Sequence, residues 1–418
     1  MASESELHLA VALDGAGWHP AAWREPGARP RELLSAGYWA DLVAEAERGL
    51  LDLVTIEDAF GPPTPGGTRP SDEADPSGST SGSGLVPPAD PRRVQGRLDA
   101  VLVAARVAPL TSRIGIVPTK VVTHTEPFHA SKEIATLDHV SLGRAGVQVR
   151  VATRPEDAAL FGRRAVPPGL RDGAHPEVLA DLFDEARDYV EVLRRLWDSW
   201  EDDAEIRDAA TGRFVDRDKL HYVDFTGPHF SVRGPSITPR PPQGQPLVAA
   251  LAHRDVAFRL VGRSADLGFV TPRDAADAAA IVAAVRAEQD AAGRAGEPLP
   301  VLGDVVVFLD DTAARARERK ERLDTRLGHS YASDAHVFVG TPGGLADLAL
   351  EWRDAGLAGL RLRPAVASHD LEQVTRGLAP ELARRGAFRT AYTADTLRGH
   401  FGMPRPANRY AEEQVRVP

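Results

Sequence analysis

The sequence predicts an α/β fold, a (β/α)8 TIM barrel with insertions. Short apolar runs that can form buried strands alternate with helical segments through most of the 418 residues. Polar residues collect directly after several of these runs, where such barrels carry their chemistry. A doubly wound sheet usually shows a glycine-rich turn after its first strand and before a helix. The stretch Asp14-Gly15-Ala16-Gly17 matches that turn only in part, because no helix starts there, so the barrel is the better prediction.

The first half of the predicted barrel contains four strands and three helices. Leu34, Tyr38, Leu42 and Ala46 form an apolar face for the first helix. Pro127 suits the start of the third helix, because a residue there needs no N–H donor. We expect strands at 7–13, 50–57, 114–117 and 145–152, and helices at 33–48, 92–110 and 127–139.

The second half follows the same alternation after a long helix at 178–200. Residues 325–338 read as a short connection between a helix and the next helix. We expect strands at 247–251, 267–270, 301–309 and 359–363, and helices at 255–265, 275–292, 312–326, 343–355 and 371–385.

We expect one domain over residues 1–418, with two excursions from the barrel. Residues 61–90 are rich in Pro, Gly, Ser, Thr and Asp and cannot bury a core, so they read as a mobile insertion. Residues 204–240 are turn-rich and strand-like, which indicates a β-hairpin excursion.

Composition and charge exclude several classes of function. The net charge is -10 and no basic stripe dominates, which argues against nucleic-acid binding. The chain has no cysteine, so disulfides, thiolate nucleophiles and cysteine-ligated zinc are excluded. We find neither a basic signal-peptide start nor a membrane-length apolar window, so we expect a cytoplasmic protein that binds no membrane. No metal site is predicted, because His221, His229 and His253 are scattered.

Several sequence blocks resemble the bacterial-luciferase-like flavin-dependent monooxygenases, in the nitrilotriacetate/dibenzothiophene-sulfone monooxygenase branch. The most specific block is the tail LAPELARRGAFRTAYTADTLRGHFGMPRPAN, residues 378–408. The resemblance covers nearly the whole chain in order. Its other blocks are RLWDSWEDDA at 195–204, VRGPSITPRPPQGQP at 232–246, HPAAWRE at 19–25, AERGLLD at 46–52 and TEPFHASKEIATLDHVSLGRAG at 125–146.

This resemblance implies a two-component enzyme with a TIM barrel whose carboxyl face binds reduced FMN (FMNH2) as a co-substrate. A separate NAD(P)H:flavin reductase supplies the flavin in that family, and O2 is used to oxidise a small organic substrate. Relatives commonly form homodimers or tetramers. The identity of the substrate does not follow, because the shared motifs serve the flavin.

The resemblance also assigns candidate site residues. His129 of TEPFH, which matches an NEPYH-like motif, and His19 are the catalytic candidates, and Trp23 belongs to the substrate side. Most candidates have a structural alternative: a helix cap or a loop carboxylate for Asp58, a helix cap for Thr119 and Thr125, a packed or surface residue for His129, a polar residue of the barrel interior for Gln148, and a loop anchor for His19 and Trp23. The cofactor-binding candidates are Asp58, Thr119, Thr125, Gln148, Thr153, His253 and Arg254.

The chain departs from this family after the predicted fifth strand. Relatives have a Gly-Ser-rich turn there that cradles the FMN phosphate, whereas this chain has Ala252-His253-Arg254. Arg254 can replace those contacts, or the phosphate site can be lost. Loss would make the protein a catalytically degenerate flavin-binding or partner subunit. A deazaflavin-dependent oxidoreductase is a second alternative, which fits the fold but not the motifs. Residues 325–338 are also shorter than the lid-like excursion expected in relatives.

Overall fold

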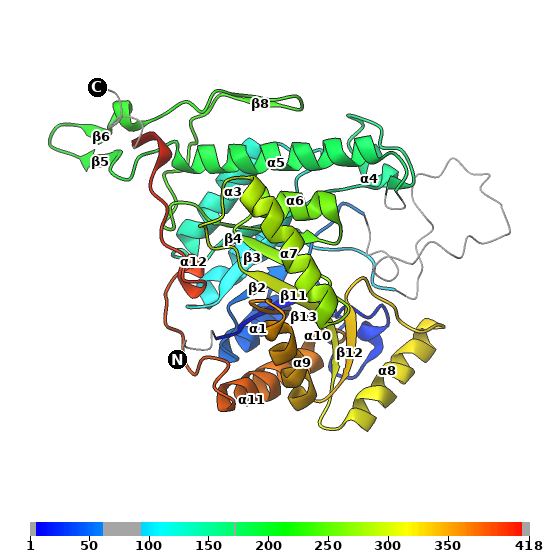
Figure 1. Cartoon of the computed structure of the whole chain (residues 1–418). Coiled ribbons are helices and arrows are strands. Elements are labelled where there is room, and N and C mark those ends of the chain that lie inside the picture. Colours follow the sequence, from blue (N-terminus) through cyan, green and yellow to red (C-terminus); the bar gives the residue numbers. More distant parts are fainter. Residues whose placement is uncertain (1–5, 62–92, 171–172, 412–418) are drawn as a thin grey trace.

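The computed structural model describes residues 6–61, 93–170 and 173–411. Its central feature is a closed barrel of eight parallel strands, which confirms the predicted fold. The barrel closes where the first and last strands pair, from His8 with Gly359 to Val11 with Leu362. Figure 1 shows helices around the strands. The barrel strands are β1 (His8–Leu13), β2 (Leu53–Ile56), β3 (Gly115–Val121), β4 (Gly146–Arg150), β9 (Leu247–Ala252), β10 (Leu267–Val270), β11 (Val301–Leu309) and β13 (Gly359–Pro364).

Helices surround the barrel, and their caps explain two wrong boundaries. Ser35 accepts a hydrogen bond from the Tyr38 N–H and Asp99 accepts one from the Leu102 N–H. The first two helices therefore begin at Ala36 and Ala100, later than predicted. The α-helices are α1 (Ala36–Arg48), α2 (Ala100–Val107), α3 (Pro127–Val140), α4 (Pro155–Ala159), α5 (Pro176–Asp198), α6 (Asp255–Ser264), α7 (Ala275–Ala291), α8 (Ala313–Leu327), α9 (Pro342–Asp354), α10 (Ala367–Gln373), α11 (Ala379–Arg384) and α12 (Leu397–His400).

Shorter helical turns complete this layer. A π-helical turn, η5 (Val374–Leu378), joins α10 to α11, so the last predicted helix is one continuous run that starts earlier than expected. Leu34 lies outside α1 and is 65% exposed, so it does not belong to the predicted apolar face. The 3-10 turns are η1 (Ala22–Arg24), η2 (Ala108–Leu110) and η4 (Arg217–Lys219).

A ninth parallel strand, β12 (His336–Gly340), was missed in the sequence. The long strand β11 pairs with β10 at its start, Val301 to Gly303, and with β12 at its end, Val305 to Leu309. The N-terminal part of β11 therefore pairs within the barrel, and its C-terminal part pairs with the extra strand. The run is short and its first four residues are only partly buried, so it lacks the pattern of a core strand. The interpretation of 325–338 as a plain connection was wrong.

The predicted excursion at 204–240 contains two short antiparallel hairpins. They are β5 (Glu205–Asp208) with β6 (Arg213–Val215), and β7 (Phe225–Thr226) with β8 (Ser231–Val232). Both lie beyond α5, away from the barrel (Figure 1). Of the predicted insertion at 61–90, all but residue 61 lies outside the described residues. In the described part of the chain, none of the helices is long and apolar enough to cross a membrane.

The barrel interior has an apolar lower level and a polar upper level. Successive strand residues face opposite sides, so Leu302 and Asp304 of β11 both point inward, one level apart. Residues from α12 and the chain after it close the lower end. The lower level consists of Ala10, Leu53, Val117, Leu247, Ala249, Leu267, Phe269 and Leu302, packed against Leu397, Phe401 and Met403.

Candidate active site

The upper level of the barrel holds a buried charge network centred on Arg361. Its Nε lies 2.7 Å from Asp304 Oδ1 and its Nη2 lies 2.5 Å from Asp304 Oδ2. Arg361 Nη1 donates to Gln148 Oε1 and approaches Glu57 Oε1 at 3.4 Å. The guanidinium also lies 4.0 Å from the Phe269 ring centre, directly above the apolar level. A charge this deeply buried is tolerated because paired and hydrogen-bonded groups surround it.

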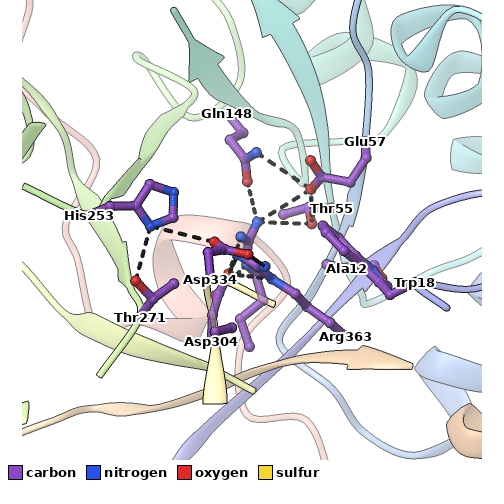
Figure 2. A network of polar contacts seen from close by, with 12 residues as sticks. Ala12, Trp18, Thr55, Glu57, Gln148, His253, Thr271, Asp304, Asp334 and Arg363 are labelled. Atoms are coloured by element: carbon purple, nitrogen blue, oxygen red, sulfur yellow. Dashed lines mark hydrogen bonds and ion pairs between the residues drawn. The ribbon is translucent and has the colours of Figure 1, made fainter. Parts of the chain in front are cut away.

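Arg363, two residues further along β13, links this network to two loops. Its Nε lies 2.8 Å from Asp304 Oδ2 and its Nη1 lies 2.8 Å from Asp334 Oδ1, in the loop before β12. The guanidinium stands 4.5 Å from the ring of Trp18, whose Nε1 donates to the Ala12 carbonyl at 2.8 Å. Figure 2 shows these side chains converging. Arg363 therefore fixes the loops after β1 and before β12 against the barrel.

His253 lies at the top of the network, directly after β9. Its Nδ1 lies 3.0 Å from Thr271 Oγ1 and 3.5 Å from Asp334 Oδ2 (Figure 2). About 40% of the side chain is exposed. Burial of the rest lowers the pKa of His253, and this effect outweighs Asp334, so the neutral imidazole is favoured. Burial would raise the pKa of Asp334, but Arg363 and His253 hold it below its usual value.

The structure brings two further predicted residues into the network. Thr119 of β3 pairs in register with Gln148 of β4, and Gln148 Nε2 donates to Thr119 Oγ1 at 3.2 Å. Both side chains are almost fully buried. They connect Arg361 to the β3 side of the barrel. Arg254 occupies the N-cap position of α6 and is exposed, one residue beyond His253.

Asp58 makes the helix-capping contact that its structural alternative describes, whereas Thr125 does not cap α3, whose N-cap residue is Glu126. Asp58 accepts hydrogen bonds from the N–H groups of Ala59 at 2.7 Å and of Ala100, the first residue of α2, at 3.1 Å. Thr125 Oγ1 donates to the Val121 carbonyl at 2.9 Å and lies 3.1 Å from the Tyr189 hydroxyl. Both residues also line a cavity of about 510 Å³ at the ends of β2 and β3. That volume is in the range typical of small-molecule sites.

Three other candidates lie elsewhere around the mouth of the barrel. His129 is exposed in the first turn of α3, with its ring centre 6.3 Å from that of Phe128. Thr153 is half-buried shortly after β4. Trp23 of η1 packs against the hydrophobic core, with the Arg24 guanidinium 6.0 Å from its ring. None of the contacts described above joins His129 to the charge network.

His19 is buried and anchors the loop after β1. Its Nδ1 accepts from the Ala21 N–H at 3.1 Å and its Nε2 lies 3.2 Å from Asp324 Oδ1 of α8. Its ring centre is 5.0 Å from that of Tyr331. Burial lowers the pKa of His19 to about 4, although Asp324 favours the charged form. These are the contacts of a loop anchor, the structural alternative named for this residue.

The buried position of His19 predicts a loss of stability in acid. Its pKa falls from 6.5 in the unfolded chain to about 4 in the fold, so the unfolded state binds the proton more readily. The contribution present above pH 6.5 should therefore disappear as the pH falls towards 4, up to about 3 kcal/mol. The measurement is urea unfolding of wild type and His19→Asn across this range. The stability gap between the two proteins should narrow on acidification, and a constant gap contradicts the assignment.

Sequence reasoning missed the charged centre of the site. Arg361 and Arg363 stand two residues apart in the predicted strand GLRLRP, and Asp304 lies within VLGDVVVFL. Charges two residues apart in an otherwise apolar strand share one face of it. In a barrel strand covered by helices, that face points into the interior. This spacing was a usable signal for Arg361, Arg363 and Asp304.

Comparison with known proteins matches most of this chain to one family. The family described as "Luciferase-like monooxygenase" matches residues 18–342. Nitrilotriacetate monooxygenase component A of Aminobacter aminovorans is 29% identical, over 99% of this chain and 100% of the relative. Dibenzothiophene-sulfone monooxygenase of Rhodococcus erythropolis (strain XP) is 26% identical, over 97% and 98%. A solved riboflavin lyase with modified FMN and riboflavin has a TM-score of 0.79 and 24% identity, covering 97% of this chain and 98% of that chain.

Proposed function

Because this chain belongs to the luciferase-like monooxygenase family, we propose that it uses reduced FMN and O2 to oxidise a small organic substrate. One oxygen atom would enter the substrate and the other would leave as water. The observation that carries this proposal is the charge network in the upper level of the barrel, with half-exposed His253 above it at the carboxyl end of β9. TIM barrels bind their ligands at this end.

The residues at the mouth fit a flavin by their chemistry. His253 and Thr271 offer polar atoms beside the partly exposed Leu251 of β9, a combination suited to a ring with apolar faces and a polar edge. α6 begins directly after this strand, and the N–H groups of its first turn suit a phosphate. Bound reduced FMN would supply the electrons for the chemistry of O2.

The protein's own contribution is to position and to hold charge. Asp304 and Asp334 keep the buried Arg363 fixed, so the polar groups below the mouth need no rearrangement when a ligand binds. Its lowered pKa keeps the imidazole of His253 neutral, and because the side chain stays accessible, its ring is available to accept a proton and return it. Trp18, held by Arg363, keeps the loop after β1 over the barrel and limits the entry of water.

The proposal includes two partners. A separate NAD(P)H:flavin reductase would supply the flavin, which agrees with the relative named as a component A. We also propose a homodimer or tetramer in solution, on the resemblance alone. His129, His19 and Trp23 stay in the proposal as candidates for catalysis and for the substrate side, with the positions described above.

Anaerobic titration with reduced FMN tests this function directly. We expect binding in the low micromolar range or tighter, and weaker binding of oxidised FMN by roughly tenfold. Calorimetry or quenching of tryptophan fluorescence gives both affinities. Absence of binding at high micromolar reduced FMN would contradict the proposal. It would favour the degenerate partner subunit, for which the altered sequence Ala252-His253-Arg254 is the supporting observation.

The variant Arg254→Ala separates the phosphate contact from binding of the ring. We expect it to weaken reduced FMN by roughly tenfold and to leave reduced riboflavin, which has no phosphate, nearly unchanged. Arg263→Ala, on the exposed side near the end of α6, serves as the matched control. Equal affinity of Arg254→Ala and wild type for reduced FMN would show that Arg254 does not bind the phosphate.

A further inference from the structure

Arg97, which lies three residues before α2 begins, has hydrogen-bond donors that the fold leaves unused. Its Nη2 lies 3.1 Å from Asp14 Oδ1, directly after β1. Its Nε and Nη1 are buried and, within the described residues, have no hydrogen-bond partner. Arg97 lines the cavity of about 510 Å³. Buried donors without acceptors are unfavourable, so an acceptor entering from this cavity would relieve that state.

Arg150 is a second cation in the same region whose charge is not neutralised by contact. It ends β4 and follows Gln148 by two residues, so it points into the barrel above the network. Its Nη1 donates to the Asp58 carbonyl at 2.9 Å. In the described parts of the chain, no carboxylate oxygen lies within 4.0 Å of the Arg150 guanidinium, the distance that defines an ion pair. Asp58 belongs to the wall of the same cavity.

The carboxylates nearby leave donors of these two arginines unused. Both Arg97 and Arg150 act on Asp14, yet burial is the larger effect and raises its pKa, so Asp14 is a weakened counter-charge. Glu57 is held by Arg361, and the Asp58 carboxylate accepts from two backbone N–H groups. Lys120, also on the cavity wall, is already paired with Glu133 at 2.6 Å. The oxygens of Asp58 and of Asp99, which also lines the cavity, are thus directed at backbone N–H groups, and the unused donors of Arg97 remain open to an anion.

We propose that Arg97 and Arg150 form an anion subsite that holds a carboxylate of the organic substrate. Arginine suits this task, because its planar fork matches the two oxygens of a carboxylate. The assignment rests on the proposed function, since it names the substrate class of the same site. It also gives a role to the unused donors of Arg97 on the cavity wall and to Arg150, which contacts Asp58 of that wall.

The phosphate of FMN is also an anion that arginine binds. The topology favours the carboxylate of the substrate as the anion beside Arg97 and Arg150. The cavity lies at the ends of β2 and β3. The N-terminus of α6, suited to the phosphate, follows β9, which lies two strands from β3 in the barrel. A flavin phosphate at α6 leaves the cavity beside Arg97 to a second anion.

The test uses Arg97→Gln and Arg150→Gln, with Arg213→Gln on the distant hairpin as control. Nitrilotriacetate and citrate, in buffer without divalent metals, are titrated calorimetrically into the protein with and without reduced FMN. We expect both arginine variants to lose roughly tenfold or more in affinity for at least one of these probes. Arg213→Gln should bind as wild type does, and Arg150→Lys should restore part of the affinity.

Two further titrations decide whether the pair of arginines binds the substrate carboxylate or the FMN phosphate. Reduced FMN and reduced riboflavin are titrated into the same variants. We expect both flavins to bind within about twofold of wild type. If the variants weaken reduced FMN but not reduced riboflavin, the pair binds the phosphate and the proposal is overturned. It is also overturned if neither carboxylate binds wild type, or if the variants bind as tightly as wild type. Carboxylate binding without flavin binding would support the subsite and contradict the proposed function.

Discussion

Asp304→Ala is expected to lower the free energy of unfolding by about 3–5 kcal/mol, because it leaves buried charge without its main partner. Asp304 is fully buried and binds both Arg361 and Arg363. Arg361 would keep only Gln148, Thr55 and the more distant Glu57. Arg363 would keep Asp334. The uncompensated Arg361 dominates the loss.

Urea unfolding followed by circular dichroism measures this effect. The matched control is Asp354→Ala, whose carboxylate is 71% exposed beside Arg353, and its change should stay within about 0.5 kcal/mol. A second pair of variants starts from Asp304→Leu. The double variant Asp304→Leu with Arg361→Met should be more stable than Asp304→Leu alone, since it removes the unpaired charge and fills the space with apolar groups. A loss below about 1 kcal/mol for Asp304→Ala would show that water or neighbouring groups solvate Arg361.

Leu397→Ala should cost about 2–5 kcal/mol, because Leu397 fills the lower end of the barrel. Its side chain is fully buried in the apolar lower level. It lies over two glycines: a methyl group on Gly115 would come within 2.4 Å of Leu397 Cδ1, and one on Gly146 within 3.1 Å of Cδ2. The residue thus occupies space that the small residues of β3 and β4 leave open. Removing it opens a cavity that the rigid strands cannot close.

A double-mutant cycle with Gly115→Ala checks this packing. In wild type the new methyl group meets Leu397 and should be strongly destabilising. In the Leu397→Ala background the same methyl group enters the cavity and should cost less. Leu142→Ala, at a side chain 79% exposed, is the control and should change stability little. Additive effects of the two substitutions would contradict direct contact.

The fold could be predicted because its signal is local and repeated. Each apolar run needs only its neighbours to show that it is buried, and eight such runs with helices between them leave few architectures. The failures are also local. α1 and α2 begin late because the side chains of Ser35 and Asp99 cap them. β12 was missed because its first four residues are only partly buried, so its pattern is weak.

The site was predictable only in part. Thr119 and Gln148 lie within β3 and β4, His253 directly follows β9, and the parallel barrel brings these strands together in one network. The partners of Arg361 could not be predicted in the same way. Asp304 and Gln148 are far from it in the chain, and only closure of the barrel makes them neighbours. A helix cap was the structural alternative for Asp58, but only the fold shows that the capped N–H group belongs to Ala100, 42 residues further along the chain.

The way in which the barrel closes has a consequence for the protein during its synthesis. β1 pairs with β13, and the lower end is filled by Leu397, Phe401 and Met403. On the ribosome the early strands emerge long before the segments that complete them, and pairings so distant in sequence form slowly. Their backbone edges and apolar faces then stay open to other chains. Nascent chains of this protein should therefore depend on chaperones until residues 359–403 have been translated.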